Sequence, residues 1–310
     1  MPIDPEVQSM LDVLDAGFPR VETMTGAEAR AVVRSRYQPN PDPEPVASVQ
    51  DREIDGPHGP IPVRIYRPAE SGSTPLPVVV FAHGGGFVFC DLDTHDGLCR
   101  AMANGVGAVV VSVDYRLAPE HPAPTAFDDV YAALEWAAVH CADLDGDPQR
   151  LVVAGDSAGG NLAATVALAA RDRRGPDVAA QVLLYPVIDD DFETDSYRTY
   201  STGHFNTRAA MQWYWQQYAP GGADSTLVSP QRADTLSGVA PAVVVTASRD
   251  PLSSEGDAYA TRLAADGVPT VHRVYDGLFH GFLTIPVLSI TQIARKQLWE
   301  DLRSVLASPN

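Results

Sequence analysis

The sequence predicts an α/β fold in which a mostly parallel β-sheet is flanked by helices on both faces. From about residue 52, short β-rich runs alternate with stretches of helical spacing, which favours parallel strands joined by crossover helices. The run from Leu76 to Ala82 is continuously apolar, as expected for a strand buried on both faces. With 310 residues, the chain could form one large α/β domain with insertions or two ordinary domains.

The expected elements follow one another from the N-terminus. Apolar residues at helical spacing between positions 7 and 33 indicate one or two docked helices, and a proline-rich connector follows at residues 39–45. Strands are then expected at residues 62–66, 76–82, 108–113, 151–154, 182–185, 242–246 and 271–274. Helices are expected between them at residues 94–104, 123–138, 161–171 and 255–266.

One stretch breaks the alternation of strands and helices. Residues 189–224 are helical in pattern and crowded with aromatic side chains, most of which are expected to pack a core. We interpret this stretch as an insertion above the sheet. The predicted organisation is an N-terminal helical segment at residues 1–50 and a main domain at residues 51–310, which carries the insertion at about 189–224.

The composition excludes several classes of partner. A formal net charge of −18 would repel nucleic acid and anionic lipid, because phosphate binding needs clustered Lys and Arg. The acidic residues are spread along the chain, so we interpret them as a solvated surface. No apolar run approaches the roughly eighteen residues that span a bilayer, so stable membrane insertion is not expected.

The cysteines and the N-terminus point to a reducing, cytoplasmic environment. The three cysteines are odd in number and form no C-x-x-C pair, which argues against a disulfide framework or a thiolate zinc site. The first residues have neither a basic nor an apolar region typical of a secretory signal. No cofactor or metal is expected, since the histidines show no ligand spacing such as H-E-x-x-H.

A pentapeptide centred on Ser157 is the first candidate for chemistry. Gly155-Asp156-Ser157-Ala158-Gly159 follows one expected strand directly and precedes an expected helix. This strand–turn–helix context is typical of a nucleophile elbow, in which small flanking residues permit a sharp turn that exposes the serine hydroxyl above the sheet. Ser157 is therefore the predicted nucleophile.

A glycine-rich loop follows the buried strand that ends at Ala82. In the run His83-Gly84-Gly85-Gly86, the glycines allow backbone N–H groups to turn toward one point in space. Acyl transfer needs such donors, because the tetrahedral intermediate develops negative charge on the former carbonyl oxygen. A phosphate-binding loop would carry a Lys and a Ser or Thr after the glycines, but Phe87-Val88-Phe89 stands there instead.

A serine nucleophile needs a base that removes its proton and a carboxylate that orients the base. His280 lies in a loop after a late expected strand, and Asp250 also follows a strand. The order Ser157, Asp250, His280 is the one expected of serine hydrolases with a nucleophile elbow. We interpret the other histidines as solvated or capping residues: His58, His95, His121, His140, His204 and His272.

These motifs together resemble the hormone-sensitive-lipase-like family of α/β-hydrolases, also called bacterial family IV esterases. The similarity covers about residues 60–285 and is carried by five pieces in order: His83-Gly84-Gly85-Gly86-Phe87, Asp114-Tyr115-Arg116-Leu117-Ala118-Pro119-Glu120, Gly155-Asp156-Ser157-Ala158-Gly159-Gly160-Asn161, Asp250-Pro251-Leu252 and Phe279-His280-Gly281-Phe282. The resemblance implies an eight-stranded sheet and a helical cap built from the N-terminal segment and the insertion. It also implies oxyanion donors at the backbone N–H groups of Gly85, Gly86 and Ala158.

The sequence departs from the family pattern at two positions. Ser254 stands where similar proteins usually carry an acidic residue, and Cys90 stands where they often carry glycine. Neither change touches the predicted triad. Because Cys90 lies four residues beyond Gly86, its thiol is expected near the mouth of the site.

The expected activity is hydrolysis of a carboxylic ester through an acyl-enzyme on Ser157, with a small-molecule ester as substrate. The aromatic insertion and the rings of Phe87, Phe89, Phe279 and Phe282 are expected to suit an apolar acyl chain, with Phe87, Phe279 and Phe282 as the predicted substrate-binding residues. The family resemblance implies short to medium acyl chains. The alternatives are amide or lactone hydrolysis and a ligand-binding receptor on a hydrolase body. A homodimer is an open alternative to a monomer.

Overall fold

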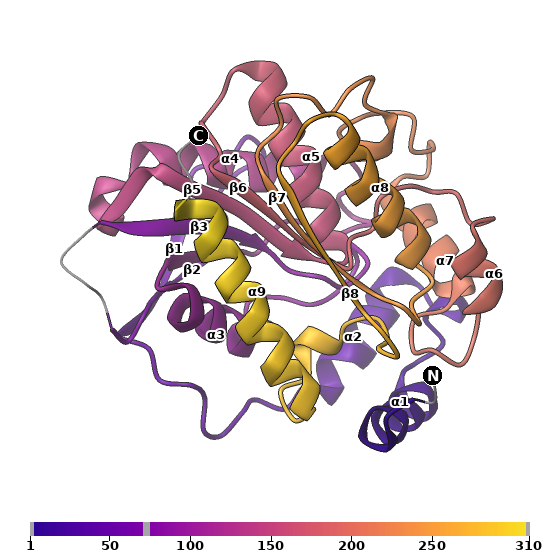
Figure 1. Cartoon of the computed structure of the whole chain (residues 1–310). Helices are drawn as coiled ribbons and strands as arrows, with labels where there is room; N and C mark the ends of the chain where they lie inside the picture. The colour runs from indigo at the N-terminus through magenta and orange to yellow at the C-terminus, as the bar shows by residue number, and fades with distance from the viewer. Residues whose placement is uncertain (1–2, 71–74, 308–310) are drawn as a thin grey trace.

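The computed structural model describes residues 3–70 and 75–307, and its central feature is an eight-stranded sheet (Figure 1). The strand order is β1-β2-β4-β3-β5-β6-β7-β8, in which β2 is antiparallel to both of its neighbours and the other neighbours are parallel. The strands are β1 (Ser48–Ile54), β2 (Ile61–Arg67), β3 (Leu76–Ala82), β4 (Val109–Val113), β5 (Gly146–Asp156), β6 (Ala180–Leu184), β7 (Ala242–Ala247) and β8 (Thr270–Tyr275). The predicted α/β class and mostly parallel sheet are confirmed.

Helices cover both faces of the sheet. On one face, α3 and α9 pack with residues such as Leu98 and Leu298 in one core cluster, whereas α4, α5 and α8 contribute to the other cluster on the opposite face. The helices are α1 (Pro5–Gly17), α2 (Gly26–Arg36), α3 (Asp96–Val106), α4 (Thr125–Val139), α5 (Ala158–Arg173), α6 (Asp195–Thr199), α7 (Arg208–Tyr218), α8 (Ser253–Ala265) and α9 (Ser289–Ala307).

Strand composition explains why the central strands are buried. Every residue of β3, β4, β6 and β7 is buried, and these strands are rich in Val, Leu and Ala. Such strands suit a sheet that is covered on both faces. The edge strand β1, by contrast, exposes six of its seven residues.

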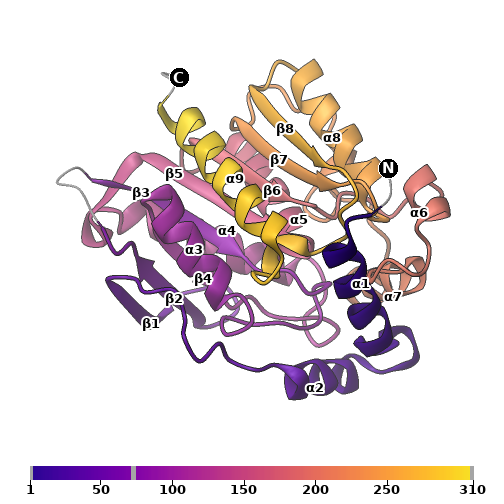
Figure 2. The same ribbon diagram turned by 60° about the horizontal axis from the view of Figure 1, so that its bottom comes forward.

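The N-terminal helices and the insertion lie together at one end of the molecule. Figures 1 and 2 both show α1 and α2 near α6 and α7. Trp213 of α7 donates its indole N–H to the carbonyl of Met24 at 3.1 Å, and the backbone N–H of Phe205 donates to Asp15 at 2.6 Å. The division into residues 1–50 and 51–310 stays a prediction, and its outer limits lie outside the described residues.

Candidate active site

The structure brings Ser157, His280 and Asp250 into one hydrogen-bonded chain. His280 Nε2 lies 2.8 Å from Ser157 Oγ, and His280 Nδ1 lies 2.6 Å from Asp250 Oδ2. The second oxygen of Asp250 accepts the N–H of Leu252 at 2.9 Å, which fixes the carboxylate. All three residues are buried, with exposed fractions of 8% or less. This arrangement can remove a proton from Ser157 and stabilise the resulting imidazolium.

Ser157 lies at the turn between β5 and α5. Its φ of +54° and ψ of −115° are unusual for a residue with a side chain, and they place the serine directly before the first turn of the helix. The turn needs its glycines, because a Cβ on Gly159 would lie 1.9 Å from the carbonyl oxygen of Ala82. A Cβ on Gly155 would likewise lie 2.1 Å from the carbonyl oxygen of Gly159.

We expect Gly159→Ala to destabilise the protein by more than about 3 kcal/mol, because the new methyl group meets fixed backbone rather than a flexible side chain. The matched control is Gly97→Ala in α3, where a Cβ has no neighbour within 4 Å and should stabilise the helix by up to about 1 kcal/mol. Urea unfolding followed by fluorescence measures both changes. Equal stability of the two variants would contradict this prediction.

The glycine loop after β3 presents the predicted oxyanion donors. Gly85 and Gly86 have φ values of +114° and +58°, and both line the cavity next to Ser157. Within the described ranges, no acceptor is assigned to the N–H groups of Gly85, Gly86 or Ala158. A Cβ on Gly86 would lie 2.4 Å from the ring of Tyr214, so a larger residue would disturb the cavity wall.

A buried aromatic platform holds the start of this loop. Tyr115 stacks on the His83 ring with centroids 4.3 Å apart and donates its hydroxyl to the His83 carbonyl at 2.7 Å. His83 Nδ1 lies 2.7 Å from the Gly84 carbonyl. Burial, together with nearby His95, lowers the pKa of His83 to about 4, so its ring is neutral at neutral pH.

The cavity beside Ser157 has a volume of about 160 Å³. Its walls combine aromatic and aliphatic side chains with a few polar groups near the triad. The N-terminal segment and the insertion close one side, where the rings of Phe18 and Phe205 meet edge to face at 5.0 Å. The lining residues are Phe18, Val33, Gly85, Gly86, Phe89, Cys90, His95, Asp156, Ser157, Phe205, Asn206, Met211, Tyr214, His280, Gly281 and Thr284.

The rings of Phe87, Phe279 and Phe282 do not line this cavity, which corrects the assignment made from the sequence. All three are at most 1% exposed. Phe87 stacks on Tyr218 at 3.8 Å, whereas Phe279 and Phe282 belong to a hydrophobic core cluster. Their apolar character serves packing, and Phe89 is the one of the four expected rings that lines the cavity.

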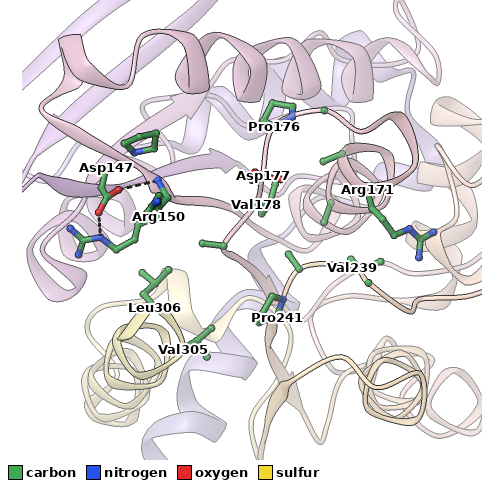
Figure 3. A pocket seen from close by; sticks show the side chains of 18 of the residues that line it. Asp147, Arg150, Arg171, Pro176, Asp177, Val178, Val239, Pro241, Val305 and Leu306 are labelled. Atoms are coloured by element: carbon green, nitrogen blue, oxygen red, sulfur yellow. Dashed lines mark hydrogen bonds and ion pairs between the residues drawn. The ribbon is translucent and has the colours of Figure 1, made fainter. Parts of the chain in front are cut away.

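A larger groove lies at the opposite end of the sheet. It has a volume of about 1030 Å³ and is lined by the amino end of β5, the segments that precede β6 and β7, and the C-terminal parts of α5 and α9 (Figure 3). Three of its charged side chains are already engaged: Arg150 pairs with Asp147 at 2.7 Å, and Arg171 donates to two backbone carbonyls. Since none of the triad lies in this groove, the smaller cavity is the candidate active site.

Ser254, which stands where similar proteins usually carry an acidic residue, exchanges two hydrogen bonds with Ser196. The backbone N–H of Ser254 donates to Ser196 Oγ, and that of Ser196 donates to Ser254 Oγ, each at 3.1 Å. The adjacent Glu255 is buried, which raises its pKa well above the usual range although it accepts the N–H of Ile188. Burial thus disfavours the charged form of Glu255.

Two further residues at the site were not identified as functional from the sequence. Asp156 accepts the N–H of Gly84 at 2.8 Å, and His95 Nε2 lies 3.1 Å from the same carboxylate. His95 was interpreted as a solvated or capping residue, but it is 6% exposed and makes no side-chain cap to α3. The sequence feature that could have identified both residues is their position next to the motifs. Asp156 precedes the serine, and His95 follows the glycine loop.

The described residues offer neither a cluster for a metal ion nor a membrane-spanning helix. Within residues 3–70 and 75–307, no group of three or more His, Cys, Asp or Glu side chains could hold a metal ion. No helix in the same ranges is long and apolar enough to cross a bilayer.

We expect a bulky maleimide to inhibit slowly by reacting with Cys90, which lines the cavity, whereas Cys99 and Cys141 are buried. Burial raises the pKa of the Cys90 thiol to about 12. As long as the pH is below this pKa, each increase of one pH unit raises the fraction of reactive thiolate about tenfold. Inactivation rates measured from pH 7 to pH 9 should follow this rise, and Cys90→Ser should resist. Full activity after complete modification of Cys90 would refute the prediction.

Comparisons with known proteins agree with this geometry. Residues 79–284 match a family described as having the alpha/beta hydrolase fold. The chain is 45% identical to carboxylic ester hydrolase LipN of Mycobacterium tuberculosis, with 83% of this chain and 70% of LipN covered. It is 42% identical to esterase LipI of the same organism, with 88% and 87% covered.

Solved structures support the same relationship. An ester hydrolase from the metagenome of Lake Arreo, solved with a bipyridine phosphonate derivative, superimposes with a TM-score of 0.92 at 37% identity, over 99% of this chain and all of that one. The sheet, the geometry of Ser157, His280 and Asp250, and the sequence identity therefore indicate the same family. The chain belongs to the α/β-hydrolase fold family, in its hormone-sensitive-lipase-like branch.

Proposed function

We propose that this protein hydrolyses carboxylic esters through an acyl-enzyme intermediate on Ser157. The observation that carries the proposal is the continuous chain from Ser157 Oγ through His280 to Asp250, with contacts of 2.8 Å and 2.6 Å. The names of the relatives, carboxylic ester hydrolase and esterase, support the same reaction.

Each residue has a defined role in the proposed reaction. Ser157 Oγ attacks the ester carbonyl while His280 Nε2 takes its proton, and Asp250 holds the imidazole in the required tautomer. His280 then donates the proton to the leaving alkoxide, which departs as the alcohol. Water, activated by the same base, releases the carboxylic acid and restores the serine.

The negative charge of the tetrahedral intermediate falls on the former carbonyl oxygen. We assign its stabilisation to the N–H groups of Gly85, Gly86 and Ala158, which have no acceptor in the described structure. A preorganised donor of this kind lowers the barrier by about 3–4 kcal/mol.

The size of the cavity favours short to medium acyl chains. At about 160 Å³, it is close to the roughly 150 Å³ that suffices for a benzene molecule. Its walls are mostly apolar away from the triad, with Phe18, Phe205 and Met211 among them. We therefore expect the preferred acyl group to have about six carbon atoms or fewer.

A chain-length series of p-nitrophenyl esters on the purified protein tests this function. We expect kcat/KM to peak at short to medium acyl chains and a serine-directed organophosphate to abolish turnover. Phe205→Ala removes a ring from the cavity wall and should move the peak toward longer chains, whereas Tyr200→Ala in the same insertion, outside the lining, should not. Absence of reaction with both the esters and the organophosphate would refute the proposal and favour a ligand-binding receptor.

Amide and lactone hydrolysis use the same machinery and are tested by the corresponding p-nitroanilides and lactones. The proposed substrate is a small-molecule ester. The cytoplasmic location and the homodimer stay predictions, which fractionation and light scattering can test.

A further inference from the structure

The carboxylate of Asp156 connects the nucleophile elbow to the glycine loop. Asp156 directly precedes Ser157 and is 4% exposed. Its Oδ1 accepts the N–H of Gly84 at 2.8 Å, and a Cβ on Gly84 would lie 2.4 Å from its Oδ2. The loop therefore lies directly against the carboxylate, as only glycine allows. The contact joins the carboxyl end of β3 to the carboxyl end of β5.

The same carboxylate also holds the far end of the segment that starts at Gly84. His95 Nε2 lies 3.1 Å from Asp156 Oδ1, and His95 Nδ1 lies 3.0 Å from Thr94 Oγ1. Both ring nitrogens of the buried imidazole therefore face oxygen atoms. Residues 84–95 form a closed loop whose two ends meet on one carboxylate, and this loop carries Gly85, Gly86 and the cavity residues Phe89 and Cys90.

Burial distinguishes the His95–Asp156 pair from the His–Asp pairs at the surface. A buried carboxylate is costly unless it is paired and hydrogen-bonded. Burial alone would raise the pKa of Asp156, but His95 and the Gly84 N–H outweigh it, and the pKa is lowered. In the described chain the buried His–Asp pairs are His95–Asp156 and His280–Asp250, and the more exposed pairs are His58–Asp128 and His272–Asp257.

We propose that His95 and Asp156 are positioning residues that clamp the loop of residues 84–95 and thereby hold the oxyanion donors against Ser157. Oxyanion stabilisation requires donors at 2.7–3.1 Å from the developing charge, and a site loosened by about 1 Å loses much of its effect. Removing the clamp should therefore weaken the transition state more than substrate binding. The inference rests on the proposed ester hydrolysis and deepens it.

The test compares His95→Ala with wild type on a p-nitrophenyl ester and on a trifluoromethyl ketone. Ser157 Oγ adds to the ketone carbon, its proton passes to His280, and the ketone oxygen becomes an oxyanion that resembles the intermediate. We expect kcat to fall about 10- to 100-fold, with KM changed less than about threefold. The inhibition constant of the ketone should rise by the same factor as kcat falls, while that of the unfluorinated ketone should not change.

The matched control is His272→Ala, which breaks the His272–Asp257 pair of 3.2 Å outside the cavity and should leave kcat and ketone affinity unchanged. His95→Gln carries an amide N–H that can reach Asp156 and should recover most of kcat. If His95→Ala does not fold, His95→Gln is compared with His95→Met, which fills the space without a donor.

Unchanged kcat and ketone affinity in His95→Ala, measured per folded molecule, would overturn the inference. Equal losses of kcat in His95→Gln and His95→Met would also overturn the inference. A wild-type protein without turnover refutes the proposed function itself, whereas wild-type turnover with unaffected His95 variants refutes only the clamp.

Discussion

Replacement of Ser157 by Ala is expected to lower kcat on p-nitrophenyl esters by on the order of 10⁶-fold, because no other group can form the acyl-enzyme. The substitution removes only the hydroxyl group, whose polar contact is the 2.8 Å hydrogen bond to His280. The fold should persist, since Ala can occupy the same turn and no core contact is lost. Steady-state kinetics, with circular dichroism as the folding control, measure the effect.

The same experiment identifies the site of covalent reaction. A serine-directed organophosphate should add one label to the wild type, located on Ser157 by peptide mass spectrometry, and none to Ser157→Ala. Turnover by Ser157→Ala within tenfold of wild type, or a label on another serine, would exclude Ser157 as the nucleophile.

Asp250→Asn is expected to lower kcat by about 10⁴-fold without unfolding the protein. Asp250 Oδ2 lies 2.6 Å from His280 Nδ1, so it selects the tautomer whose Nε2 can accept the serine proton. An amide nitrogen at this position would donate to Nδ1 and place the imidazole proton on Nε2, facing Ser157. The base then cannot take the proton, and burst kinetics should show slow acylation.

Asp257→Asn is the control for this change. Asp257 also pairs with a histidine, His272, at 3.2 Å, but neither residue lines the cavity. Its kcat should equal that of wild type. A loss of kcat in Asp250→Asn that is no greater than the loss in Asp257→Asn would contradict the role assigned to Asp250.

The apolar strands of the sheet were predictable because burial on both faces leaves a direct mark on the sequence. The run Leu76 to Ala82 matches β3 in both limits. The strand β1 was missed, since Ser48–Ile54 is a polar edge strand with little apolar signal. Helix α9 was also missed, although Ala294, Leu298 and Leu302 repeat at helical spacing and are buried.

The grouping of Ser157, His280 and Asp250 in one hydrogen-bonded chain could be predicted because each residue is set at a strand end by a local motif. Ring direction could not be predicted in the same way: Phe87 and Phe89 are two residues apart in one loop, yet Phe87 stacks on Tyr218 and Phe89 lines the cavity. The contact between His95 and Asp156 joins positions 61 residues apart in sequence, and no local pattern encodes it. Tertiary packing alone determines such details.

The cavity wall is assembled from residues that run from Phe18 to Thr284. During synthesis, the ribosome must therefore release the chain at least as far as Thr284 before this wall can close. A nascent chain that already contains Ser157 still lacks both its base and its orienting carboxylate, because His280 and Asp250 come later. Ester turnover should consequently appear only after His280 and Thr284 have left the ribosome, and it can serve as a sensitive reporter of complete folding.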